Sequence, residues 1–163
     1  MEVKLHRGNS ILLLITALSF ISLRVPAQVK SKSEIIDTAK AKAKHISIAQ
    51  LKQKIKSGKD FFLIDVRTEK EYLAGHIGGA LWIPRGKLEF GILGLSRQAG
   101  ADIVLYCRSG ARSSLAALAL NEMGFIKTVS LKGGFKHWVE EGNTAYNMHG
   151  EFRVVNYLKK ERK

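Results

Sequence analysis

The chain has 163 residues, a length that suggests a single domain, and 45% of its residues are hydrophobic, as in an ordinary globular protein. Its net charge of +13 makes it strongly basic, but it contains only one cysteine, Cys107. A single cysteine excludes an intramolecular disulfide and a metal site built on paired cysteines.

The first 27 residues have the pattern of an export signal. Basic residues precede an apolar run from Ile11 to Leu23, and Val25-Pro26-Ala27 supplies the small residues of a cleavage site. A membrane span needs about 20 apolar residues, which is more than the run from Ile11 to Leu23 provides. We therefore expect a signal peptide over 1–27, cleavage after Ala27 and a periplasmic or secreted protein without stable membrane insertion. The alternative is that the signal is retained as an anchor.

Residues 28–44 are polar and rich in lysine. Ile35, Ile36, Ala39 and Ala43 form only a weak helical stripe. This segment is expected to be a linker or a frayed helix without a function of its own.

From residue 45 onwards, helical and strand patterns alternate. Ser47 and Gln50 form the capping box of a helix that extends to about Ser57. Apolar runs predict strands over 61–66, 80–83, 103–106 and 128–131, with helical segments over 68–74, 85–95, 113–123 and 135–141. Such alternation predicts an α/β fold, with a mainly parallel central sheet and helices on both faces. Residues 143–163 form a polar C-terminal extension whose few apolar residues could dock on the domain.

The segment Cys107–Arg112 connects the third predicted strand to the helix that follows it. Ligands of parallel sheets bind at the carboxyl ends of the strands. A helix N-terminus, Arg108 and Arg112 all favour an anion here, and Gly110 lets the N–H groups of the loop turn inward. These features predict a reactive thiolate at Cys107, whereas the alternative is a buried, structural thiol.

Other short motifs occur in a fixed order around this loop. They are Asp65-Val66-Arg67, Glu71-Tyr72, Gly75-His76-Ile77, Gly79-Ala80, the segment Cys107–Ser113, and Gly133-Gly134 followed by Trp138. In this order and spacing the chain resembles the rhodanese (thiosulfate sulfurtransferase) family over about residues 45–142. With the signal pattern in front, it is similar to the small single-domain periplasmic members of bacteria. The resemblance implies a single rhodanese-like domain.

The resemblance also implies a sulfurtransferase. Cys107 would take the outer sulfur of thiosulfate as a persulfide, and cyanide or a thiol, including a protein thiol, would accept it. The persulfide would be held by the backbone of Arg108, Ser109, Gly110, Ala111 and Arg112. The two arginines would also attract the small anionic donor. No cofactor is implied.

Supporting roles fall to residues outside the loop. Asp65, Arg67 and Glu71 are expected to hold the structure, with Arg67 and Glu71 pairing across a helix start because they are four residues apart. The His76 ring is expected to bond to the backbone, and Trp138 to lie in the core. The remaining histidines lack the spacing of metal ligands, so no metal site is predicted.

Three other readings compete with sulfur transfer. Phosphatases and arsenate reductases also place Cys and Arg on an anion cradle, but with Cys-x5-Arg spacing, whereas Cys107 and Arg112 have Cys-x4-Arg spacing. A non-catalytic binding module of the same fold typically lacks the cysteine. Nucleic-acid binding is not expected, because the lysines are spread through both tails and form no basic stripe with interleaved aromatic residues.

Overall fold

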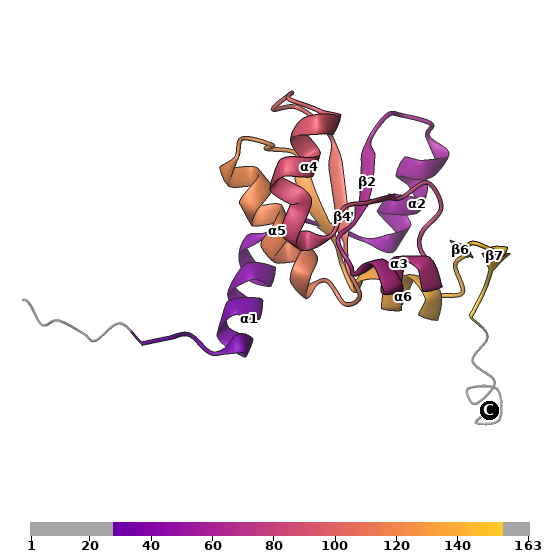
Figure 1. The fold of residues 1–163 in the computed structure, drawn as a ribbon, viewed down its shortest axis with the longest axis horizontal. Helices are drawn as coiled ribbons and strands as arrows, with labels where there is room; N and C mark the ends of the chain where they lie inside the picture. The colour runs from indigo at the N-terminus through magenta and orange to yellow at the C-terminus, as the bar shows by residue number, and fades with distance from the viewer. Residues whose placement is uncertain (1–27, 155–163) are drawn as a thin grey trace, which may run out of the picture.

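The computed structural model describes residues 28–154, so the predicted signal peptide at 1–27 lies outside the described residues, as do residues 155–163. The helices are α1 (Lys32–Lys42), α2 (Ile48–Lys56), α3 (Glu69–Ala74), the 3-10 helix η1 (Arg85–Lys87), α4 (Leu88–Leu95), α5 (Ala111–Glu122) and α6 (Gly134–Glu140). The strands are β1 (His45–Ile46), β2 (Phe62–Asp65), β3 (Leu81–Trp82), β4 (Ile103–Tyr106), β5 (Thr128–Leu131), β6 (Ala145–Asn147) and β7 (Gly150–Phe152). Figure 1 shows their arrangement.

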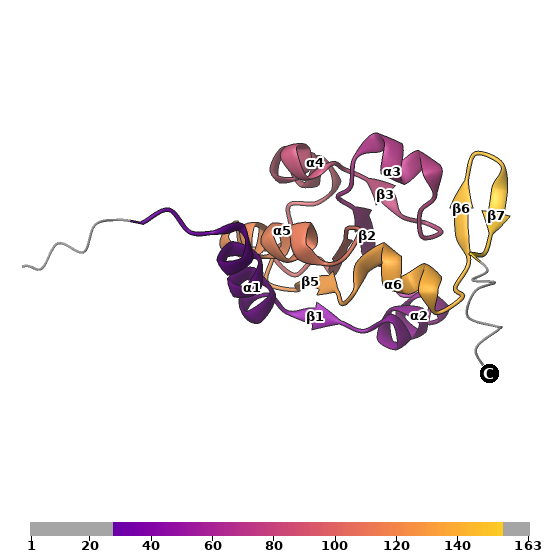
Figure 2. The ribbon, with the colours of Figure 1, turned by 90° about the horizontal axis from the view of Figure 1, so that it is seen from below.

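Five parallel strands form the central sheet in the order β1-β5-β4-β2-β3. One face packs on α4 and α5, and the other packs on α2 and α6, so the sheet has a core on each side (Figure 2). All four residues of the central strand β4 are buried. The burial of β4 explains its unbroken apolar sequence. The parallel sheet with helices packed on both faces confirms the predicted α/β fold.

The segment that was expected to be a linker or frayed helix contains α1. Ser31 and Glu34 form a complete capping box at its start, and α1 packs against α5 (Figure 1). Ala39 and Ala43 are buried by this packing, at 1% and 7% exposure. The helical stripe of apolar residues in this segment is weak because α1 buries only small side chains. After α1 comes β1, a two-residue strand that was not predicted because it is too short to show a period.

The C-terminal extension contains the antiparallel hairpin β6–β7. Tyr146 pairs with His76 through two backbone hydrogen bonds of 2.9 Å. The rings of Tyr146 and Phe152 lie so close to Gly78 and Gly75 that a side chain at either glycine would overlap them. The hairpin therefore adds to the edge of the domain over the turn that follows α3.

Within residues 28–154, no helix combines the length and the apolar character that a membrane span requires.

Candidate active site

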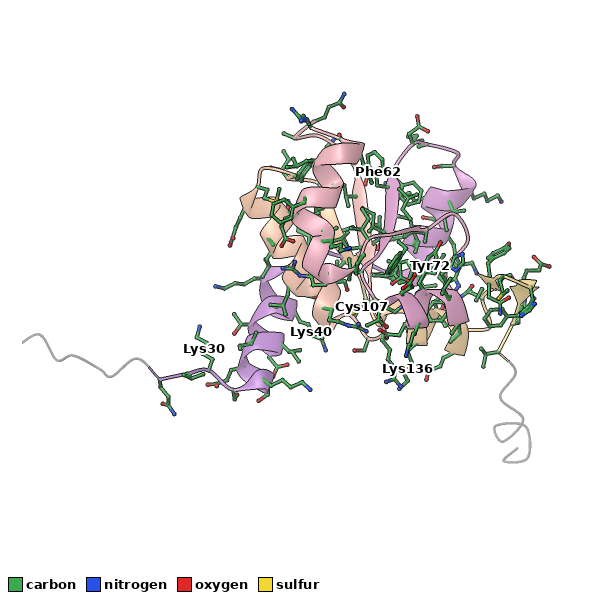
Figure 3. All side chains as sticks on the ribbon, in the orientation of Figure 1. Lys30, Lys40, Phe62, Tyr72, Cys107 and Lys136 are labelled. Atoms are coloured by element: carbon green, nitrogen blue, oxygen red, sulfur yellow. The ribbon has the colours of Figure 1, made fainter. Side chains whose placement is uncertain are left out.

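Cys107 follows the central strand β4 at the carboxyl edge of the sheet and is 1% exposed. Figure 3 shows it near the lower end of the sheet, in the orientation of Figure 1. The backbone N–H of Gly110 donates to the Cys107 Sγ atom over 3.2 Å. Gly110 has a φ of 93° and is the residue before α5, a conformation that favours glycine because it has no Cβ. The loop thus closes on the sulfur, with Ala111 beginning α5.

Two buried serines lie behind the sulfur. The Ser113 hydroxyl is 3.6 Å from the Cys107 Sγ atom, within reach of a weak hydrogen bond to sulfur, and 3.2 Å from the Gly110 carbonyl oxygen, which it can bond instead. The Ser130 hydroxyl, on the neighbouring strand β5, is 2.8 Å from the Ser113 hydroxyl. Both serines are fully buried. They can donate along a chain from Ser130 to Ser113 to a negatively charged sulfur. Sequence reasoning did not single out either serine as a site residue.

Helix α6 holds the loop from the other side. The N–H groups of Phe135 and Lys136 donate to the carbonyl oxygens of Cys107 and Arg108 over 2.8 and 2.9 Å. Gly134 makes this approach possible, because it has a φ of 61° and a Cβ there would overlap the Cys107 carbonyl. This close contact is the structural reason for a glycine at position 134, whereas a side chain at Gly133, which has a φ of 79°, would overlap His137.

Arg112 forms a bidentate ion pair with Glu71 of α3. The two hydrogen bonds measure 2.7 and 2.8 Å. They are the main reason that the pKa of Glu71 falls to about 2, with smaller contributions from the backbone and hydroxyl of Thr68. Glu71 in turn raises the pKa of Arg112, and the Cys107 sulfur adds a smaller effect in the same direction. The guanidinium group therefore links α3 to the start of α5.

The predicted pairing of Arg67 with Glu71 is wrong. Arg67 instead binds Asp65, with Nε donating to both carboxylate oxygens over 3.0 and 2.9 Å and Nη2 donating over 2.7 Å. Both residues are buried, at 4% and 0% exposure. The Arg67 guanidinium also donates to the Gly75 carbonyl and lies 4.1 Å from the centre of the Phe135 ring. Arg67 therefore joins the end of β2 to α3 and to α6. The N–H groups at the start of α6 are the ones that hold the loop.

The other predicted residues lie as follows. Arg108 and Ser109 are exposed on the outside of the loop. The His76 Nδ1 atom is 3.2 Å from the Tyr72 carbonyl, and Trp138 is buried with its indole N–H on the Thr144 carbonyl at 2.8 Å. The predictions of a backbone-bonded His76 and a core Trp138 are both confirmed. Among residues 28–154, no group of three or more His, Cys, Asp or Glu side chains is placed to hold a metal ion.

Comparison with known proteins defines the class. Residues 47–141, more than half of the chain, match the rhodanese-like domain. A sulfurtransferase of Allochromatium vinosum is 33% identical over 97 residues, which cover 60% of this chain and 89% of that protein.

Two solved structures have the same fold. The human single-domain sulfurtransferase TSTD1 has a TM-score of 0.54 at 28% identity, covering 61% of this chain and 97% of the human chain. A Rhodopseudomonas palustris protein of unknown function, described as a possible tyrosine phosphatase, has a TM-score of 0.63 at 28% identity, covering 72% and 96% of the two chains.

The chain belongs to the rhodanese-like domain family. The names of its relatives place sulfur transfer among the activities of this family.

Proposed function

We propose that this protein moves a sulfane sulfur from thiosulfate, or a similar donor, through a persulfide on Cys107 to cyanide or a thiol. The observation that carries the proposal is the environment of the sulfur. The Cys107 Sγ atom accepts the Gly110 N–H at 3.2 Å and lies 3.6 Å from the buried Ser113 hydroxyl. Donors fixed around one sulfur atom stabilise a thiolate before the reaction and a persulfide after it.

The chemistry divides into two balanced steps. The Cys107 thiolate attacks the outer sulfur of thiosulfate, so a Cys–S–S bond forms while the bond to the sulfite sulfur breaks and sulfite leaves with the electron pair. The acceptor then attacks the outer sulfur of the persulfide. The Cys107 thiolate leaves with the electron pair of the broken S–S bond, and cyanide becomes thiocyanate or a thiolate becomes a persulfide.

The position of Arg112 speaks against phosphate-ester chemistry. In a phosphate cradle the arginine presents its paired N–H groups to the oxyanion. Here both terminal nitrogens of Arg112 are bound to Glu71, at 2.8 and 2.7 Å. The Cys-x4-Arg spacing also encloses a smaller space than Cys-x5-Arg.

Mass spectrometry of the protein after incubation with thiosulfate tests the proposal. We expect a mass increase of one sulfur atom that cyanide removes, with thiocyanate as the product. The Cys107→Ser variant should gain no mass, since the chain has no other thiol. A parallel assay with an aryl phosphate decides between the readings. Hydrolysis of the phosphate without sulfur uptake would favour a phosphatase, and neither activity would favour a non-catalytic module.

A further inference from the structure

A cavity of about 950 Å³ lies between α2, the turn that follows α3, the end of α6 and the β6–β7 hairpin. These elements gather at one end of the molecule (Figure 2). Pockets for small organic molecules measure roughly 300–1,000 Å³, so the cavity has room for such a molecule. No residue of the Cys107 loop, 107–112, lines it, and the sulfur chemistry proposed above does not involve it.

The walls of the cavity are largely apolar and aromatic. Ile55 of α2 and Tyr146 of β6 line it and are 43% and 38% exposed. The lining also includes Ile77, Trp138 and the His76 side chain. Apolar surface that faces water in a concave place gains free energy when a ligand covers it.

The aromatic side of the cavity is held in place by the C-terminal extension. Two backbone hydrogen bonds of 2.9 Å join His76 to Tyr146, and the Trp138 indole N–H donates to the Thr144 carbonyl over 2.8 Å. The His76 ring also stacks on the Tyr72 ring, with 4.0 Å between the ring centres. Walls that are already ordered cost a ligand less free energy than walls that must be ordered on binding.

Part of the cavity comes from outside the family's shared segment. Thr144 and Tyr146 line it, but both follow residues 47–141, which match the rhodanese-like domain. The Tyr146 ring lies against Gly78, where a side chain would overlap it. The site therefore depends on the hairpin that this chain adds to the domain.

Positive charge is in excess on the cavity wall. Lys52 and Lys56, one turn apart on α2, line the cavity and are exposed. Neither forms an ion pair with any carboxylate of residues 28–154. Glu141, which also lines the cavity, lies 3.3 Å from the His137 ring. An apolar wall with two ammonium groups that lack carboxylate partners is complementary to a ligand with an apolar body and a negative charge.

We propose that this cavity binds a small organic anion that has a ring-containing apolar body and one acidic group. The rings would lie against Ile55 and Tyr146, and the carboxylate or sulfonate would pair with Lys52 and Lys56. The proposal is independent of sulfur transfer, because none of these residues takes part in the two steps at Cys107.

Two fluorescent probes that differ by one charge test this assignment on the full chain. 1-Anilinonaphthalene-8-sulfonate carries a sulfonate, and N-phenyl-1-naphthylamine has the same rings without it. Both should bind the wild type with a rise in fluorescence. Lys52→Gln/Lys56→Gln should weaken binding of the sulfonate about 5-fold, as expected when two exposed ion pairs are lost, and leave binding of the neutral probe unchanged. Ile55→Ser should weaken binding of both probes about 5-fold, because it removes apolar contact.

Matched controls make the same changes elsewhere. Lys42→Gln/Lys127→Gln removes two exposed lysines, on α1 and before β5, that do not line the cavity. Phe90→Ser removes an exposed ring from α4, whose outer face is the other apolar surface of the described chain on which the probes could bind. Neither control should change the Kd of either probe. Circular dichroism of each variant shows that it is folded, since the sulfonate probe also fluoresces on loosely packed protein.

Three results of the probe titrations would overturn the proposal. They are absence of binding to the wild type, equal weakening of both probes by Lys52→Gln/Lys56→Gln, and loss of binding in Phe90→Ser. The other candidate occupant of the cavity is a second copy of this chain, which sedimentation velocity detects. A dimer that Ile55→Ser dissociates would assign the cavity to that interface and overturn the small-anion site.

Discussion

The sulfur atom of Cys107 lies within hydrogen-bond reach of the Gly110 N–H and of the Ser113 hydroxyl, which is itself paired with the Ser130 hydroxyl. Gly110, Ser113 and Ser130 come from the loop, from α5 and from β5. The charged residue nearest to Cys107 in the sequence is Arg108, and its side chain is exposed. At the scale of single residues, oriented dipoles would therefore stabilise a negative charge on this sulfur, whereas the charge of Arg112 is already paired with Glu71.

The buried serine pair gives the first prediction. Ser113→Ala should slow alkylation of Cys107 by iodoacetamide at neutral pH and move the rate profile to higher pH, because the thiolate loses a hydrogen-bond donor. Sulfur transfer should fall about 10-fold, somewhat less than the loss of a main oxyanion-hole donor. Ser130→Ala should have a smaller effect in the same direction.

Ser114→Ala is the control for this experiment. Ser114 is equally buried in the same turn of α5 and, like Ser113, can donate to the Gly110 carbonyl, but it makes no hydrogen bond with the sulfur. Its alkylation profile should match that of the wild type. A shift as large as that of Ser113→Ala would show that general loosening of the loop, and not the hydroxyl at the sulfur, causes the effect.

The Glu71–Arg112 pair gives a prediction about pH. The pKa of Glu71 falls from 4.5 to about 2 in the folded protein, so the stabilisation is present above pH 4.5 and is lost as the pH falls towards 2. Glu71→Gln should lower the free energy of unfolding by about 1 kcal/mol at pH 7, since the pair is partly exposed and screened by solvent.

Chemical denaturation of wild type and Glu71→Gln over a range of pH measures this difference. It should shrink between pH 4.5 and 2. Glu69→Gln, an exposed residue in the same turn of α3, controls for the removal of one negative charge. If the difference between wild type and Glu71→Gln stayed constant down to pH 2, the ion pair would not be its source.

At the scale of elements, the loop is held by helices that follow or precede it by many residues. The start of α6 binds two of its carbonyl groups, and α3 binds its arginine through Glu71. The buried Asp65–Arg67 pair joins these supports, because its guanidinium group contacts both Gly75 and Phe135. The geometry of the sulfur site is thus set by the docking of α3 and α6 on the carboxyl edge of the sheet.

The contact between α6 and the loop gives the third prediction. Gly134→Ala should lower the free energy of unfolding by about 3 kcal/mol and abolish most sulfur transfer, because the new Cβ would overlap the Cys107 carbonyl and push α6 away. Unfolding experiments and the thiosulfate assay measure the two effects.

Gly142→Ala separates overlap from backbone strain. Gly142 also has a positive φ, of 75°, but the space around it is open. This variant should cost about 1 kcal/mol from strain alone and leave sulfur transfer intact. Equal losses of stability and of sulfur transfer in Gly134→Ala and Gly142→Ala would show that the close approach of Gly134 to the loop contributes to neither.

At the scale of the whole molecule, the described chain extends the rhodanese-like domain at both ends. On the N-terminal side α1 packs on α5 and brings Lys40 to a cavity beside the loop. On the C-terminal side the β6–β7 hairpin covers the turn after α3. Residues that look like polar tails in the sequence therefore pack on the domain, and those of α1 contribute surface beside the loop.

Export is a prediction of the sequence that concerns residues outside the described range. We propose that cleavage after Ala27 makes Gln28 the first residue of the exported protein, because small residues end a short apolar run. N-terminal sequencing of material from the periplasm or the medium identifies the first residue. A chain that begins before Leu23 would indicate a retained anchor.

The sequence by itself determined the features that arise from local patterns. Alternating helical and strand periods predicted the parallel sheet, and the only cysteine, at the end of a buried strand, predicted the position of the candidate site. Arg67 and Glu71 were paired wrongly because spacing along a helix indicates only local neighbours. The true partner of Glu71 is Arg112, 41 residues further along the chain.

The tertiary structure decided which distant residues meet. Ser113 and Ser130 became a pair because α5 packs on β5, and Lys40 approached the loop because the alanines of α1 allow close packing on α5. The two-residue strand β1 and the short hairpin β6–β7 had too few residues to show a period. Such contacts depend on which elements pack against each other. The period of one element indicates which of its faces is buried, but not which residues of another element that face meets.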